Sequence, residues 1–134
     1  MTPQPSKHQP KPVFVDNSVA AQRPDQYVEL TVDARKVLAD WKSSLLAHEL
    51  LDSNGMVKGD DHLSESRLEK RDAVRSRLAA QQPLEKPILG IGIFDNIEIG
   101  SGSDILATLV MEGVTHLPVH IRKAQARDFD PFKV

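Results

Sequence analysis

The chain has 134 residues, of which 40% are hydrophobic and 27% are charged, and its formal net charge at pH 7 is −2. This composition is typical of one globular domain, and any binding to nucleic acid would need a local basic patch. The chain contains no cysteine, which excludes disulfides, zinc–thiolate sites and thiol nucleophiles. No apolar run approaches the length of a membrane span and the N-terminus lacks the apolar core of a signal peptide, so we expect a soluble, cytoplasmic protein with no membrane partner.

The N-terminal segment is rich in proline and polar residues. We therefore expect residues 1–25 to be a disordered arm, within which the apolar stretch Val13 to Val15 is able to dock as an edge strand. A single domain is predicted over residues 26–128, followed by a charged tail at 129–134. The first strand of the domain is predicted at Tyr27 to Val32, where apolar and polar residues alternate.

Two helices are predicted next. The first follows Asp33, a suitable N-cap, and ends before the stop signal at residues 52–55. Its apolar residues recur at helical spacing and form one face: Val37, Leu38, Trp41 and Leu45. The second helix lies within residues 63–82, with Ser64 or Ser66 as its cap.

A hairpin follows the helices. Residues 88–94 are apolar at nearly every position, which is typical of a central strand covered on both faces. Asp95 and Asn96 favour a tight turn, so residues 97–100 should return antiparallel to that strand.

The last part of the domain contains a small-residue turn at Ser101 to Ser103, a helix at residues 104–112 and a strand at residues 115–121. Gly113 is the expected C-cap of that helix. The predicted fold is therefore a small α+β domain with a mixed sheet, in which two helices precede the central hairpin and one follows it.

The second half of the chain resembles the ParB/sulfiredoxin-like superfamily. The stretch LEKPILGIGIFDNIEIGSG, residues 84–102, matches the hairpin and motif glycine of the ParB branch, and Leu117-Pro118-Val119 matches its I-P-V strand. In that family, the motif glycine is followed by an acid and by arginines that hold the phosphates of nucleotides or nucleic acids. Here Asp104 and Ile105 replace the two adjacent arginines and Ala107 replaces a third basic residue. The sulfiredoxin branch has a cysteine directly after the glycine, where this chain has Ser103.

The turn itself has two interpretations. The backbone N–H groups and hydroxyls of Ser101, Gly102, Ser103 and Asp104 are suited to cradling a phosphate at a helix start. Ser103 is equally an ordinary N-cap, and Asp104 is a helix-stabilising residue in a first turn. Because an aspartate repels phosphate unless a metal intervenes, we favour the structural interpretation, a tight corner derived from a phosphate site.

A second candidate site is the basic face of the second predicted helix. Arg67, Arg71 and Arg75 recur every four residues and form a stripe that is able to contact nucleic-acid phosphates, with Lys70 and Arg77 close by. Arg122 and Lys123, after the last strand, would extend the patch. Acidic residues interleave with the stripe, so pairing within the helix on a solvated face is the favoured alternative.

A metal site is not expected. His116 and His120 share one face of the last strand, but no third ligand has a suitable spacing. By its resemblance, the protein is expected to be a non-catalytic binding or regulatory protein in plasmid or mobile-element maintenance or transfer control, with DNA or a protein as partner and no cofactor. The alternative is a nucleotide-dependent phosphotransferase or nuclease with a rebuilt site at Ser101 to Asp104, using a nucleotide with Mg²⁺.

Overall fold

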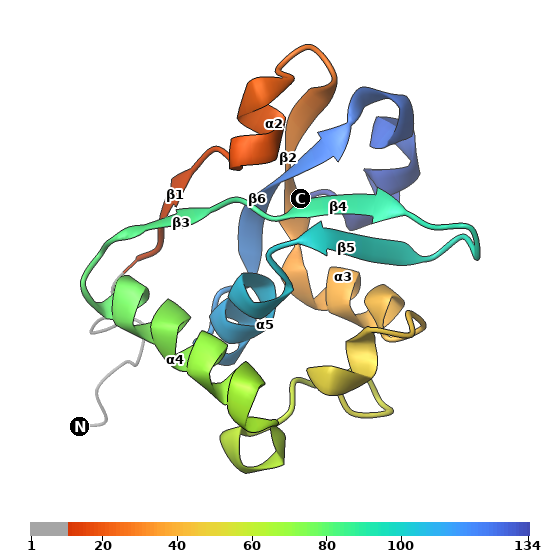
Figure 1. Ribbon diagram of the computed structural model, residues 1–134. Helices are drawn as coiled ribbons and strands as arrows, with labels where there is room; N and C mark the ends of the chain where they lie inside the picture. The colour runs from red at the N-terminus through yellow and green to blue at the C-terminus, as the bar shows by residue number, and fades with distance from the viewer. Residues whose placement is uncertain (1–10) are drawn as a thin grey trace, which may run out of the picture.

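The computed structural model describes residues 11–134 as helices and strands that enclose one core (Figure 1). In chain order, the elements are β1 (Val13–Val15), α2 (Ser18–Gln22), β2 (Tyr27–Asp33), α3 (Ala34–Trp41), α4 (Glu65–Ala79), β3 (Pro83–Glu85), β4 (Ile88–Ile91), β5 (Ile97–Ser101), α5 (Ser103–Met111) and β6 (His116–Arg122). Short 3-10 segments at Ala47–Glu49, Asp60–His62 and Lys123–Phe132 complete the described chain. None of its helices is long and apolar enough to cross a membrane.

The main sheet has four strands in the order β2-β6-β4-β5. β6 runs antiparallel to β2 and parallel to β4, while β4 and β5 form the predicted antiparallel hairpin. β1 and β3 form a separate two-stranded parallel sheet. The α+β class and the mixed sheet are therefore confirmed.

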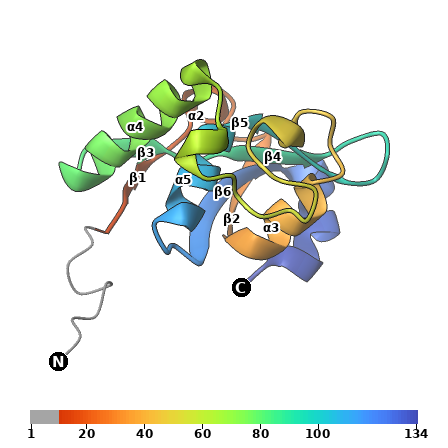
Figure 2. The same cartoon turned by 90° about the horizontal axis from the view of Figure 1, so that it is seen from below.

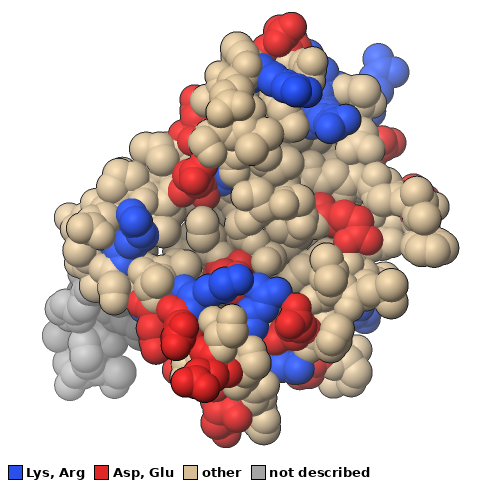
Figure 3. Space-filling view, in the orientation of Figure 1, with Lys and Arg blue, Asp and Glu red and all other residues tan. Residues whose placement is uncertain are grey.

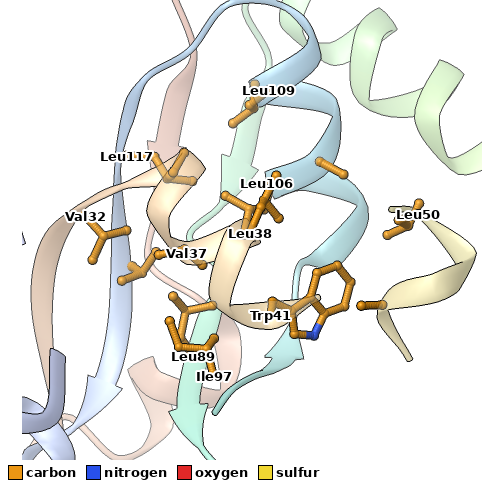
Figure 4. Close-up of a cluster of buried hydrophobic side chains, with 14 of the residues drawn as sticks. Val32, Val37, Leu38, Trp41, Leu50, Leu89, Ile97, Leu106, Leu109 and Leu117 are labelled. Carbon is orange, nitrogen blue, oxygen red and sulfur yellow. The ribbon is translucent and has the colours of Figure 1, made fainter. Parts of the chain in front are cut away.

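The core lies where α3 and α5 pack against the sheet (Figure 4). Trp41 on α3 is 2% exposed, which confirms its predicted place in the core. Leu106 and Leu109 on α5 and Leu89 and Ile97 on the hairpin are buried in the same cluster. This packing fixes the position of the turn between β5 and α5.

The predicted disorder of residues 1–25 is wrong for the part that the structure describes, while residues 1–10 lie outside it. β1 pairs with β3, as its apolar sequence allowed. Asn17 is 2% exposed, and its Nδ2 donates to the carbonyl oxygen of Lys86 at 3.1 Å. Lys86 Nζ lies 2.8 Å from Asp16 Oδ1. These long-range polar contacts order the segment, and a compositional argument cannot detect them.

The C-terminal residues are also more than a charged tail. Phe129 is fully buried and its ring packs against Phe132, with 6.0 Å between the centroids. Lys133 forms a β-bridge to Val32 at the edge of the main sheet. Residues 129–134 therefore belong to the domain rather than following it.

Two predicted elements end early. α3 ends at Trp41, so Leu45 leaves the apolar face and is 84% exposed. Ser44 helps to end the helix because its hydroxyl donates to Glu98 and accepts from Leu46 N. β4 ends at Ile91, and the next residues form the hairpin turn instead of a covered strand.

Candidate functional site

The turn before α5 is a close-packed corner. Gly102 has φ +88°, and a Cβ there would lie 3.0 Å from Pro87 Cα. Only glycine fits such a position without strain. Gly102 is also the N-cap, so Ser103 is the first residue of α5 and makes no capping hydrogen bond.

The hydroxyl of Ser101 takes part in a structural joint. Ser101 Oγ accepts a hydrogen bond from Asn17 Nδ2 at 3.3 Å. Asn17 also caps α2, because its Oδ1 accepts from Val19 N at 2.9 Å. Ser101 thus helps to connect the N-terminal segment to the end of β5.

α4 packs across the start of α5, which brings the two predicted candidate regions into one site. The Nη1 atom of Arg67 donates to Asp104 Oδ2 at 2.8 Å, and its Nη2 donates to Glu49 Oε2 at 2.8 Å. The Arg67 and Asp104 side chains are 20% and 17% exposed. The cation that the turn lacks in sequence is therefore supplied from α4, 37 residues away along the chain.

The ion pairs explain the electrostatics of this site. The Arg67 guanidinium lowers the pKa of Glu49 through its hydrogen bond and its charge. In turn, Glu49 and Asp104 raise the pKa of Arg67. One arginine thus lies between two carboxylates, and its charge is already compensated.

A shallow pocket of about 320 Å³ adjoins the turn. It is lined by Lys70, Ala73 and Val74 from α4 and by residues 102–105. Within residues 11–134, Lys70 forms no ion pair, so it is the available cation of this pocket. Backbone N–H groups in the first turn of a helix have no intrahelical partners, so they add to the anion-binding capacity.

The predicted basic stripe does not face solvent as a stripe. Arg71 is 1% exposed, and its Nη1 donates to Lys58 O at 2.7 Å and to Asp60 Oδ1 at 3.1 Å. Arg75 donates to both oxygens of Asp60, at 2.7 and 3.0 Å. The two arginines hold the preceding loop to α4, so the prediction of a nucleic-acid contact is wrong for the buried Arg71.

The alternative of pairing within α4 is also mostly wrong. The intrahelical pair in this stripe is Arg75 with Asp72, at 3.5 Å. The shorter pairs involve Glu49, Asp60 and Asp104, which lie outside α4. Figure 3 shows Lys and Arg side chains in the lower centre of this face, bordered by acidic side chains.

The remaining basic residues lie elsewhere. Arg77 donates to Pro83 O at 3.3 Å. Arg122 ends β6, opposite Tyr27 in the register with β2, and Lys123 N donates to Gln26 O. α4 lies at the other end of the molecule from this group (Figure 1). Arg122 and Lys123 therefore do not extend the α4 stripe.

The interface between α4 and α5 contains buried polar atoms that have no hydrogen-bond partner among the described residues. They are Arg71 Nε and Nη2, Asp104 Oδ1 and Thr108 Oγ1. Arg67 and Arg71 are four residues apart on α4, as are Asp104 and Thr108 on α5, so both pairs have the spacing of one helix face. That spacing was the available sequence signal for Thr108, which the sequence analysis missed.

The described residues contain no group of three or more His, Asp or Glu side chains that is able to hold a metal ion. His120 is 8% exposed and its Nε2 lies 3.6 Å from Asp16 Oδ1, whereas His116 is exposed. The two histidines thus have different surroundings.

Comparison with protein-family models, with curated proteins and with solved structures finds no match to this chain.

Proposed function

We propose that this protein is a non-catalytic binding module of the ParB-like class, which acts in the cytoplasm through protein contacts in plasmid or mobile-element maintenance or transfer control. The observation that carries the proposal is the pair between Arg67 and Asp104. By the resemblance of residues 84–122, the family would hold phosphate at this turn, and here the pair supplies both charges from the protein itself. The ParB-like class is proposed from the resemblance of residues 84–122.

The distribution of charge favours a protein partner over DNA. DNA affinity depends on cations that neutralise phosphates and release counterions. Arg67, Arg71 and Arg75 each have a carboxylate partner already, and Arg71 is buried. A phosphate contact by Arg67 or Arg75 would first require these ion pairs to break. The cost of breaking them offsets much of the free energy gained by binding phosphate.

The geometry of the turn disfavours nucleotide chemistry. Gly102 is in close contact with Pro87, so the turn is fixed by packing. Asp104 lines the pocket beside the turn, and its carboxylate is paired with the Arg67 guanidinium, which would otherwise be free to contact a phosphate. A bound phosphate would therefore rely on Lys70 and on backbone N–H groups.

One observation supports the second candidate, a nucleotide-dependent phosphotransferase or nuclease. The pocket beside Gly102 to Ile105 has Lys70 in its wall and Asp104 at its border. A nucleotide with Mg²⁺ would place the metal on Asp104 and the phosphates near Lys70. This arrangement requires Arg67 to release Asp104.

Calorimetric titration with CTP–Mg²⁺ and ATP–Mg²⁺, and fluorescence anisotropy with a short DNA duplex at two salt concentrations, test the proposal. We expect no saturable heat and only weak, salt-sensitive DNA binding. Saturable nucleotide binding that Lys70→Ala weakens, while Lys36→Ala on α3, outside the lining of this pocket, does not, would contradict it. Tight DNA binding lost in Arg75→Ala would contradict the preference for a protein partner.

A further inference from the structure

The β4–β5 hairpin carries two adjacent apolar side chains at its tip. Ile93 is 94% exposed and Phe94 is 79% exposed. The tip projects from the rest of the molecule in both views (Figures 1 and 2). Single exposed apolar residues are ordinary, whereas adjacent ones at a projecting position mark a contact surface.

The tip is held in one conformation. Gly92 N donates to Asn96 O at 2.9 Å, and Asp95 N donates to Gly92 O at 3.0 Å. Asn96 is 6% exposed, and its Nδ2 donates to Ile97 O at 2.9 Å. Glu98 packs against Gly92 so closely that a Cβ there would lie 2.8 Å from Glu98 Cγ. A tip that is already ordered loses little conformational entropy when it binds.

A pocket of about 390 Å³ lies between α3, the loop around Gly55 and the end of α5. Its apolar walls are formed by Leu38, Ala39, Met56, Val57, Val110 and Met111. The volume suits a small organic group and has room for a phenyl ring. The two methionines allow the walls to adapt to the shape of an inserted side chain.

Charge makes the tip and the pocket complementary. Asp95 follows Phe94 directly, and Arg35 is the charged residue of the pocket lining. Neither side chain forms an ion pair within residues 11–134, and both are exposed. A phenylalanine that enters this pocket would bring its neighbouring carboxylate towards an available guanidinium.

We propose that the pocket receives the hairpin tip of a second copy of this chain. Phe94 of one copy fills the pocket of the other, Asp95 pairs with Arg35, and the reciprocal contact closes a two-fold dimer. A dimer formed by tip against tip is disfavoured, because it would bring the Asp95 and Glu98 carboxylates of both copies together. The dimer is independent of the partner in the proposed function.

Analytical ultracentrifugation of the full chain, from about 1 to about 500 µM, tests the dimer. The wild-type protein should show a monomer–dimer equilibrium. Phe94→Ser should raise the dissociation constant by about tenfold or more, because it removes the side chain that fills the pocket. Val134→Ser is the matched control, since Val134 is 66% exposed and lies outside both the tip and the pocket.

A charge exchange identifies the contact. Asp95→Lys and Arg35→Asp should each weaken the dimer, and the two changes together should restore the dissociation constant to within about threefold of wild type. Circular dichroism checks that each variant is folded. A monomer at every concentration, a dimer that Phe94→Ser leaves unchanged, or a charge exchange that fails to restore the dimer would overturn the proposal.

Discussion

Arg67 Nη1 on α4 and Asp104 Oδ2 on α5 lie 2.8 Å apart and join the two helices at the start of α5. The pair links a residue of the predicted basic stripe to a residue of the predicted phosphate turn. Each side chain thereby neutralises the charge of the other, which would otherwise be available to a ligand. The same contact therefore affects both the local stability of the turn and its affinity for anions.

The first prediction concerns this contact. Arg67→Ala and Asp104→Ala should each lower the free energy of unfolding. The loss in the double variant should be smaller than the sum of the two single losses, by a coupling energy of about 1 kcal/mol. Urea unfolding of the four proteins gives the coupling energy. Arg77→Ala combined with Asp104→Ala is the control cycle, because Arg77 binds Pro83 O instead, and it should be additive. A coupling energy near zero for Arg67 and Asp104 would show that the pair does not join the helices.

The second prediction concerns the glycine of the turn. Gly102→Ala should destabilise the protein by about 2 kcal/mol or more, because φ is +88° and the new Cβ would contact Pro87. Gly100→Ala is the matched control, since its Cβ would lie 3.8 Å from the nearest atoms and its φ is not in the left-handed region. Thermal unfolding compares the two variants. Equal losses would contradict the close packing of Gly102.

The third prediction concerns pH. Hydrogen bonds from Arg75 and Arg71 lower the pKa of Asp60 from 3.8 to about 2. A pKa that is lower in the folded state means that the contribution of Asp60 to stability is fully present above about pH 4 and is lost as the pH falls towards 2. The free energy of unfolding should therefore decline across this window. Asp60→Asn should flatten this decline, which urea unfolding at successive pH values measures. An unchanged slope in the variant would show that Asp60 is not a source of the decline.

The fourth prediction concerns the N-terminal segment. Asn17→Ala removes the α2 cap and two side-chain hydrogen bonds, to Lys86 O and to Ser101 Oγ, and should cost about 1–3 kcal/mol. Asn54→Ala, at an exposed position whose side chain makes no such contacts, is the control. Hydrogen exchange should also become faster in β1 of the Asn17 variant. Unchanged stability would mean that residues 13–22 are held by other contacts.

Sequence periodicity predicted the elements whose pattern is local. Tyr27 to Val32 and the helix after Gly102 were predicted within one or two residues, because the alternating or helical spacing of apolar residues is a local property. Leu45 and Phe94 continued apolar patterns but are exposed, since a serine and a tight turn end these elements first. Periodicity does not include such competing hydrogen bonds.

The candidate site was predicted in parts but not as a whole. Both α4 and the turn were identified, yet their contact depends on how α4 packs, which the sequence does not state. Asp60 and Glu49 were missed as arginine partners because they lie in short 3-10 segments that have no motif spacing to the arginines of α4. The order of residues 13–22 was missed because Asn17 and Lys86 are 69 residues apart.

The most direct test of the account is an NMR titration of the ¹⁵N-labelled protein with CTP–Mg²⁺, followed at the backbone amides of Ser103, Asp104 and Ile105. These amides are at the first turn of α5, where a bound phosphate would accept their hydrogen bonds. With the turn closed by Arg67 and Asp104, their shifts should stay unchanged to millimolar nucleotide. Saturable shifts centred on these three amides, with release of the Arg67 side chain from Asp104, would contradict the account.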